Sequence, residues 1–320
     1  MSYGTVLAPD GTHAGMVHVP GGTFQMGSDR HYPEEAPSHR VTVDDFWIDS
    51  APVTNRQFTA FVRATGHVTF AEIAPDPADY PGSLPGMIFA GSLVFTPPKH
   101  QVDLRDWSQW WTLMKGANWR HPYGPKSGIK GLDDHPVVHV AFADALAYAE
   151  WVGKELPTEA EWEFAARGGL EGTEFAWGDE FMPEGRAMAN TWHGEFPHQR
   201  HSHYKRTSPV RAFPPNGYGL YDMIGNVWEW TTDWWSTQHE PDSTKACCIP
   251  HNPRGGPEAA SYDPHLPDIR IPRKAIKGGS HLCAPNYCRR YRPAARHAEA
   301  VDTSTSHVGF RCIIRKRGEP

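Results

Sequence analysis

Hydrophobic and polar residues alternate in two short runs near the start of the chain, which is the pattern of half-buried strands. The first run spans residues 16–28 and contains a glycine-rich turn, and the second spans residues 41–48. A helix is predicted next, because Thr54 and Gln57 have the spacing of a capping box and Gly66 ends the apolar stripe that follows them. The start of the chain thus predicts two strands and one capped helix.

Periodicity is lost over residues 74–132, which are rich in Pro, Gly and Trp, so we expect a long folded loop region there. A short apolar strand is predicted at 135–140 and a helix at 144–152. A second capping box at Thr158 predicts another helix. The remainder, residues 170–320, contains short strand-like runs between turns.

Composition favours a compact but irregular fold. The 30 glycines and 30 prolines make up roughly a fifth of the chain, well above the usual ~12%. The 13 tryptophans exclude low-complexity disorder, because such segments lack large aromatic residues. Neither a repeat nor a linker divides the sequence, so we predict one domain over residues 1–320.

Charge and cysteine content narrow the class of protein. The formal net charge of −6 gives no electrostatic basis for binding nucleic acid or an anionic membrane. We recognise neither a secretory signal nor an apolar stretch approaching about 18 residues. The number of cysteines is 5, so they cannot all pair, which favours a reducing compartment. We therefore expect a cytoplasmic protein.

A pair of cysteines, Cys283 and Cys288, is the most informative local feature. Two thiols at this spacing can form a disulfide, remain as buried thiols, or bind a soft metal such as Cu(I). The cationic side chains of Arg289, Arg290 and Arg292 would lower the thiol pKa values and favour thiolates. Spacing alone leaves the structural and the functional interpretation open.

Six further sequence blocks extend the pattern around this pair. They read PGGTFQMGS at 20–28, LPTEAEWE at 156–163, NGYGLYD at 216–222, GNVWEW at 225–230, KGGS at 277–280 and GFRC at 309–312. Over residues 16–313 the chain resembles the formylglycine-generating enzymes, the sulfatase-modifying oxidases. Most blocks mark the superfamily, and the cysteine pair is what resembles the oxidase subgroup.

The resemblance implies a single irregular α+β domain related to C-type lectin folds, with little regular secondary structure. It implies an enzyme that uses O2 and a thiol reductant to convert the cysteine of a Cys-x-Pro-x-Arg segment in an unfolded sulfatase to Cα-formylglycine. Cu(I) would be held by Cys283 and Cys288 in near-linear coordination, with Cys288 the permanent ligand and Cys283 the more exposed sulfur. We expect a monomer.

Other site residues follow from the same resemblance. Ser280, Tyr287 and Trp228 would line the active site, although Trp228 also suits a plain core position and Ser280 a turn. Ser92 and Ala71 would lie near the groove for an extended peptide.

A first Ca²⁺ site is implied at four positions: Asp222, Gly225, Val227 and Glu229. Without the resemblance, two carboxylates at this spacing would more often lie on the surface. A second Ca²⁺ site is implied at Asn190, Thr191 and Tyr204, but Ser202 stands where its acid belongs. We expect this second site to be empty, with Lys205 or Arg206 replacing the charge of the ion.

The remaining histidines and cysteines have simpler interpretations. The histidines His193, His198, His201 and His203 could bind Zn²⁺ or Ni²⁺, but a surface loop is preferred. We expect Cys247 and Cys248 to be free thiols. We also expect Cys312 to be reduced, because Pro293 stands where secreted relatives have a bridging cysteine.

Two hypotheses from different classes therefore remain. The first is the copper-dependent oxidase. The second is a related domain that has the same fold but another function, either a lectin-like binding module or a non-haem-iron sulfoxide synthase. Such synthases carry an additional N-terminal helical domain, for which we expect no room before residue 16, and a binding module has no need of the cysteine pair.

Overall fold

The computed structural model describes residues 13–241 and 248–316, and within them the regular elements are short. The helices are α1 (Asn55–Thr65), α2 (Phe142–Trp151) and α3 (Glu159–Arg167). The strands are β1 (Met16–Val19), β2 (Gly22–Met26), β3 (His39–Val43), β4 (Phe46–Asp49), β5 (Gly91–Phe95), β6 (Trp111–Lys115), β7 (Trp228–Trp234), β8 (Arg273–Lys277), β9 (Arg296–Ala300), β10 (Val308–Gly309) and β11 (Ile313–Arg315). No helix in this described part is long and apolar enough to cross a bilayer.

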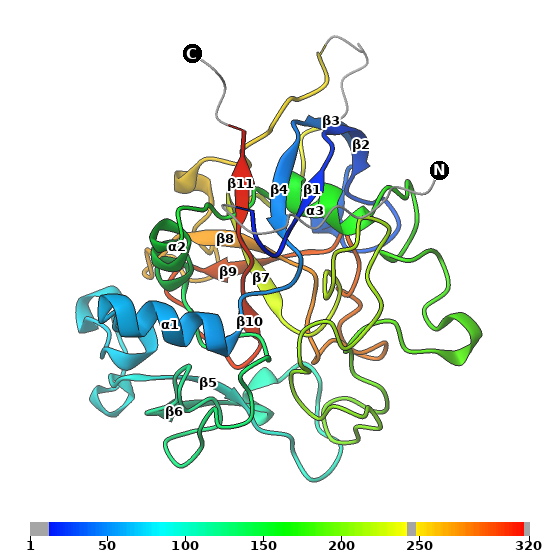
Figure 1. The fold of residues 1–320 in the computed structure, drawn as a ribbon. Coiled ribbons are helices and arrows are strands. Elements are labelled where there is room, and N and C mark those ends of the chain that lie inside the picture. Colours follow the sequence, from blue (N-terminus) through cyan, green and yellow to red (C-terminus); the bar gives the residue numbers. More distant parts are fainter. Residues whose placement is uncertain (1–12, 242–247, 317–320) are drawn as a thin grey trace.

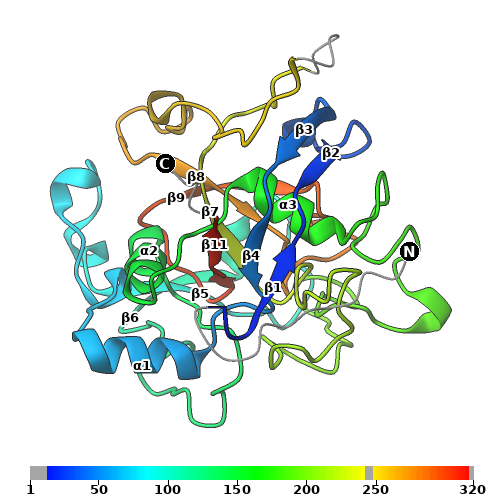
Figure 2. The same cartoon turned by 45° about the horizontal axis from the view of Figure 1, so that its top comes forward.

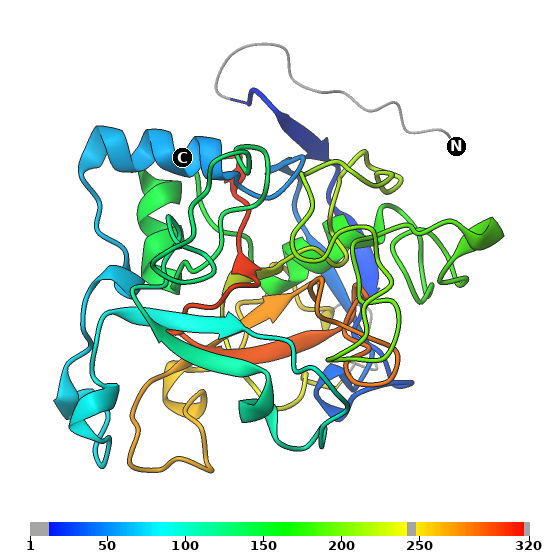
Figure 3. The same ribbon diagram turned by 90° about the horizontal axis from the view of Figure 1, so that it is seen from below.

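Small sheets form the framework (Figure 1). β4 lies between β1 and β11 in an antiparallel sheet, and the β2–β3 pair continues the ribbon of β1 and β4 (Figure 2). A second sheet has the order β10–β7–β8–β9. The β5–β6 pair lies alongside β9 when the molecule is seen from below (Figure 3). The connection from β8 to β9 carries both cysteines of the pair.

Both predicted capping boxes are present. The Thr54 hydroxyl accepts from the Gln57 amide at 3.4 Å, and the Thr54 amide donates to the Gln57 side chain at 2.9 Å. Thr158 caps α3 in the same way, accepting from the Glu161 amide at 3.1 Å. Gly66 ends α1 with a φ of 71°, a left-handed conformation that glycine adopts without strain.

Tertiary packing changed several other predictions. The runs at 16–28 and 41–48 each divide into two strands, because the chain bends between β1 and β2 and between β3 and β4. Residues 135–140 include a buried apolar segment but form no strand, since His139 has a φ of 60°. The predicted loop region at 74–132 contains the β5–β6 pair.

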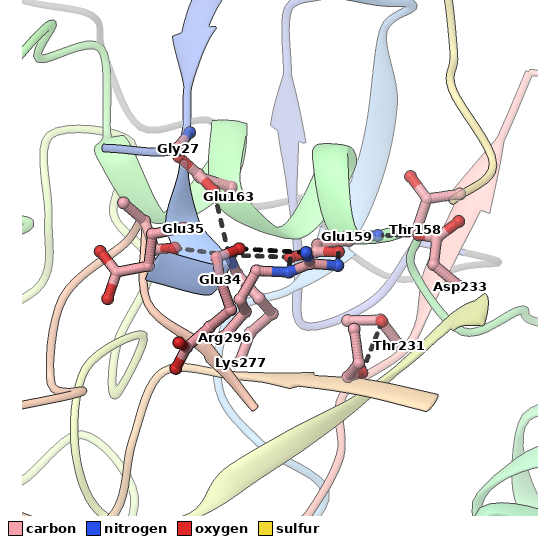
Figure 4. A network of polar contacts seen from close by, with 12 residues as sticks. Gly27, Glu34, Glu35, Thr158, Glu159, Glu163, Thr231, Asp233, Lys277 and Arg296 are labelled. Carbon is pink, nitrogen blue, oxygen red and sulfur yellow. Dashed lines mark hydrogen bonds and ion pairs between the residues drawn. The ribbon is translucent and has the colours of Figure 1, made fainter. Parts of the chain in front are cut away.

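Helix α3 is buried along its whole length, charged residues included, and packs against β2, β3, β7 and β8. Lys277 Nζ lies 3.0 Å from Glu163 Oε2, and Arg296 donates to both Glu159 oxygens at 2.7 and 2.8 Å (Figure 4). Burial alone would raise the pKa of Glu159, but Arg296 and then Lys277 outweigh it and lower that pKa to about 2. This network fixes the end of β8, from which the cysteine loop departs.

Candidate active site

A cavity of about 510 Å³ opens beside the cysteine loop. Its walls come from β5, β6, β7 and β9 and from the loop that follows β8. Segments far apart in the sequence therefore meet here, and both cysteines of the pair belong to the lining.

Two glycines turn the chain from β8 into this wall. Gly278 and Gly279 have φ values of 91° and 70°. A Cβ at Gly278 would lie 2.9 Å from the Met223 carbonyl oxygen, and one at Gly279 would lie 2.7 Å from the Arg290 carbonyl oxygen. Only glycine fits both the conformation and the space. The tight turn lets the two thiols point to one place.

The sulfur atoms of Cys283 and Cys288 lie 3.1 Å apart, and both thiols are unbridged. The exposure of the two is the reverse of the prediction, since Cys283 is only 2% exposed and Cys288 is partly exposed. The reason is packing: Cys283 belongs to the core cluster that contains Trp228 and Tyr291, and Cys288 packs against the edge of that cluster.

The two sulfurs differ in acidity. Burial raises the pKa of Cys283 well above its ordinary value, and its neighbour Cys288 adds to the effect. A hydrogen bond from the Cys283 thiol lowers the pKa of Cys288 to about 7 despite burial, and the Arg290 charge helps. Cys288 is thus the sulfur that ionises first.

Of the three arginines expected to favour thiolates, Arg290 lines the cavity with the pair. Arg289 instead forms an ion pair with Glu174 at 2.5 Å. Arg292 makes a buried bidentate pair with Glu35 at 2.5 and 2.7 Å. The prediction is corrected to Arg290, because this is the arginine of the three whose charge lowers the pKa of Cys288, although it also pairs with Glu34.

Trp228, Ser280 and Tyr287 all lie in the lining of this cavity. The Ser280 hydroxyl accepts from the Leu282 amide at 3.1 Å, so it also closes the turn. The Tyr287 ring stacks on Phe196 with centroids 4.6 Å apart and remains 41% exposed. The structure therefore brings the predicted active-site residues to one wall, Tyr287 being the most exposed of them.

Among the lining residues that the sequence analysis did not predict are His297, Glu299 and His307, which carry titratable side chains. Burial lowers the pKa of His297 to about 4 and that of His307 to about 3, and it raises that of Glu299 to about 7. The sequence could have indicated two of these residues together, because His297 and Glu299 are two residues apart on β9 and alternate residues of a strand share a face.

The two predicted groove residues are placed differently. Ser92 contributes to the lining of a second cavity but is 2% exposed, and its hydroxyl donates to the Ser304 carbonyl at 2.6 Å. Ala71 is 1% exposed and lines neither cavity, because its short 3₁₀ turn packs the methyl group inward. The expectation of a peptide contact by the Ala71 side chain is therefore not met.

Comparison with known proteins decides the family. A model of the sulfatase-modifying factor enzyme 1-like domain matches residues 5–316. The chain belongs to this family. A formylglycine-generating enzyme of Mycobacterium tuberculosis is 53% identical, over 93% of this chain and 97% of the relative. One from Mus musculus is 43% identical, over 93% of this chain and 74% of the relative.

Two further comparisons concern activity within the family and the fold. A mouse protein named inactive C-alpha-formylglycine-generating enzyme 2 is 38% identical over 93% of this chain and 84% of the relative, so the family includes proteins named inactive. The solved structure of PvdO from Pseudomonas aeruginosa has a TM-score of 0.60 at 26% identity, covering 93% of each chain. The predicted fold class, an irregular α+β domain of this family with little regular secondary structure, is confirmed.

In this family member, the residues expected at the first Ca²⁺ site fit a cation only in part. Both Glu229 oxygens accept from Arg311, at 2.7 and 2.8 Å, so that carboxylate already has a cation. Asp222 is buried, and burial raises its pKa to about 6. Gly225 and Val227 lie buried beyond it on the same turn. Asp222 accepts from the Arg211 amide at 2.7 Å and from the Asn226 side chain at 3.4 Å, but it forms no ion pair with a residue of the described ranges.

The residues expected at the second Ca²⁺ site do not fit an ion. The Arg200 guanidinium donates to the Asn190 side-chain oxygen at 3.2 Å, and the Ser202 hydroxyl donates to the Thr191 carbonyl at 3.0 Å. Two of the expected oxygen ligands therefore already have donors, while Tyr204 packs edge-on against Phe213. No carboxylate belongs to this set.

The cation at this loop is Arg200, not Lys205 or Arg206. Lys205 is exposed, and Arg206 lies over the Tyr123 ring at 3.7 Å. Arg200 sits 4.9 Å above Trp192, and burial lowers its pKa to about 10. Sequence reasoning found the missing charge but named the wrong residue, because only the fold brings Arg200 beside Asn190.

The remaining predictions concern the histidine loop and the cysteines outside the pair. His201 and His203 are exposed, and no group of three His, Cys, Asp or Glu residues in the described ranges is arranged to hold a metal. Cys312 is a buried, unbridged thiol, as predicted. The prediction for the vicinal pair concerns Cys247, which lies outside the described residues.

Proposed function

We propose that this protein is a copper-dependent oxidase that converts the cysteine of a Cys-x-Pro-x-Arg segment in sulfatases to Cα-formylglycine, using O2 and a thiol reductant. The observation that carries the proposal is the pair of unbridged sulfurs 3.1 Å apart in the wall of a cavity of about 510 Å³. Relatives named formylglycine-generating enzyme support it. A purely lectin-like module would not require two thiols in such a place.

The residues proposed to hold Cu(I) are Cys283 and Cys288. Their soft sulfur donors and low ligand number suit this ion. Bound Cu(I) would supply an open position for the substrate thiolate and the redox chemistry with O2. The two sulfur atoms that would hold the ion lie 3.1 Å apart in the metal-free protein. Cys288 is the less tightly packed of the two ligands, since it lies against the edge of the core cluster that contains Cys283.

Several side chains around the cysteine pair would support this chemistry. Arg290 stabilises the Cys288 thiolate, and its guanidinium is held by Glu34 at 2.5 Å. Trp228 belongs to the same buried core cluster as Cys283, which limits the access of water to that sulfur. Tyr287, with its exposed ring, is placed to contact an entering peptide. Ser280 holds the turn and presents a hydroxyl to the same cavity.

The test is turnover of a synthetic peptide by the copper-loaded protein. We expect O2 consumption together with an aldehyde product in the mass spectrum, both dependent on Cu(I) and on dithiothreitol. A copper-loaded, folded protein that binds the peptide but consumes no O2 would reject the proposal and favour the inactive branch of the family.

We further propose that one Ca²⁺ binds at Asp222, with the carbonyls of Gly225 and Val227 and the carboxylate of Glu229. The support is that Asp222 is a buried carboxylate with hydrogen-bond donors but with no ion-pair partner among the described residues. Saturating Ca²⁺ at about 100 times Kd is expected to increase the free energy of unfolding by about 2.7 kcal/mol. Thermal unfolding with Ca²⁺ and with EDTA measures this, and Asp222→Asn should abolish the difference.

Calorimetric titration should give a stoichiometry near one, because Arg200 stands in place of a second ion. The matched variant is Arg200→Ala combined with Ser202→Asp, which restores a carboxylate and should raise the stoichiometry toward two. A second equivalent bound by the wild-type protein would contradict this account.

A further inference from the structure

The loop of residues 190–208 contacts the cysteine loop and is rich in cations. The Trp192 amide donates to the Cys283 carbonyl at 2.9 Å, which joins the two loops directly. No Asp or Glu occurs from residue 196 to residue 221, whereas Arg200, Lys205 and Arg206 fall within that range. This stretch of the sequence therefore has no carboxylate of its own to balance these charges.

Arg200 is a cation of this loop whose hydrogen bonding is incomplete. It is partly buried, whereas its chain neighbours Gln199 and His201 are exposed. Its guanidinium lies 4.9 Å from the centre of the Trp192 ring, and Nη2 donates to the Asn190 side-chain oxygen at 3.2 Å. Nε and Nη1 are buried and have no hydrogen-bond partner among the described residues. Buried N–H groups without an acceptor cost free energy, so an additional acceptor would stabilise this arrangement.

A second cation, Arg206, lies close enough to influence Arg200. Asn190 joins the two residues, because its side-chain nitrogen donates to the Arg206 carbonyl at 2.9 Å. The Arg206 guanidinium lies over the Tyr123 ring at 3.7 Å, and neither arginine forms an ion pair with a residue in 13–241 or 248–316. Burial lowers the pKa of both, and the charge of Arg206 adds to the effect on Arg200. Two positive charges thus lie near each other without a carboxylate from the described residues to balance them.

The neighbouring histidines respond to the same positive charge. Burial is the largest cause of the lowered pKa values of His193 and His281, and Arg200 is the charged group that contributes most after it. A positive potential of this kind disfavours a metal ion and favours an anion. The free N–H groups of Arg200 are buried and leave little room for a large ligand, so a monatomic anion such as chloride is the class that suits them.

We propose that this loop binds one small inorganic anion, of the size of chloride, through the free N–H groups of Arg200, with Arg206 adding to the positive potential. The ion bound here would have the opposite sign to the Ca²⁺ that the family resemblance implies at Asn190 and Thr191. Arg200 packs on Trp192, whose amide donates to the Cys283 carbonyl, so the anion would stabilise the contact between the two loops. The inference does not depend on the oxidase activity.

The test compares thermal unfolding of the metal-free protein in sodium chloride and in sodium gluconate at equal ionic strength, since gluconate is too large for the site. Chloride at about ten times its half-saturating concentration is expected to raise the unfolding midpoint by about 2–4 °C. Arg200→Met keeps much of the packing on Trp192 but removes the cation, and it should abolish this shift. In gluconate the variant should be at least as stable as the wild type, because it removes a partly buried, unpaired charge.

Arg120→Met is the matched control. Arg120 also lies over a tryptophan ring, that of Trp119 at 4.3 Å, but it is paired with Glu72, so this variant should keep the full chloride shift. Crystals of the wild type soaked in sodium bromide give a second readout that needs no variant, namely an anomalous peak beside the Arg200 guanidinium. Equal midpoints of the wild type in the two salts, an equal chloride shift in Arg200→Met, or bromide at other positions only would overturn the inference.

Discussion

Replacing Cys288 with serine is expected to lower kcat/KM for peptide oxidation by at least about 10³-fold. A serine hydroxyl has nearly the same size, but it is a poor ligand for soft Cu(I) and does not ionise at neutral pH. Cys288 is also the sulfur with the lower pKa, about 7, and the more accessible of the two. The measurement is the rate of O2 consumption with excess peptide and reductant, at matched protein concentration.

A second readout separates loss of metal from loss of fold. Competition with a chromogenic Cu(I) chelator should show weaker copper binding by Cys288→Ser, while its thermal midpoint stays close to that of the wild type. Cys312→Ser is the matched control, because Cys312 is also an unbridged thiol but is buried away from the cavity lining. Unchanged turnover by Cys288→Ser, or an equal loss in the control, would remove the sulfur pair from the mechanism.

Replacing Lys277 with methionine is expected to lower the free energy of unfolding by about 3–5 kcal/mol. Lys277 is 0% exposed, and its ammonium group lies 3.0 Å from Glu163 and 3.4 Å from Glu159 (Figure 4). Methionine fills a similar volume but leaves two buried carboxylates with less compensation. Arg167 and Arg296 still pair with them, at 2.6 and 2.7 Å, which limits the loss. Denaturant unfolding followed by tryptophan fluorescence gives the midpoint and the slope.

The control for this change is Lys316→Met. Lys316 also pairs with a carboxylate, that of Asp45, but its side chain is largely exposed, so the expected loss is about 0–1 kcal/mol. Adding Glu163→Gln to Lys277→Met should recover part of the stability, because it removes one uncompensated charge. A Lys277→Met protein as stable as the control would mean that α3 tolerates unpaired charge in its interior.

Local sequence was sufficient to predict the features whose interactions join residues that are close together in the chain. The capping boxes at Thr158 and Thr54 predict both helix starts, since their hydrogen bonds join residues three apart. The cysteine pair was also visible, because its members are close in sequence and the glycines beside them signal a tight turn. The sequence blocks shared with the family predicted the irregular α+β domain.

Only the tertiary structure decided which of these residues act together and in what electrostatic setting. Sequence order suggested that three arginines act on the thiols, but Glu35 and Glu174, from distant segments, pair with two of them. The exposure of Cys283 and the position of Arg200 were mispredicted for the same reason. Burial and charge pairing depend on atoms brought together from remote parts of the chain, and local pattern carries no information about those contacts.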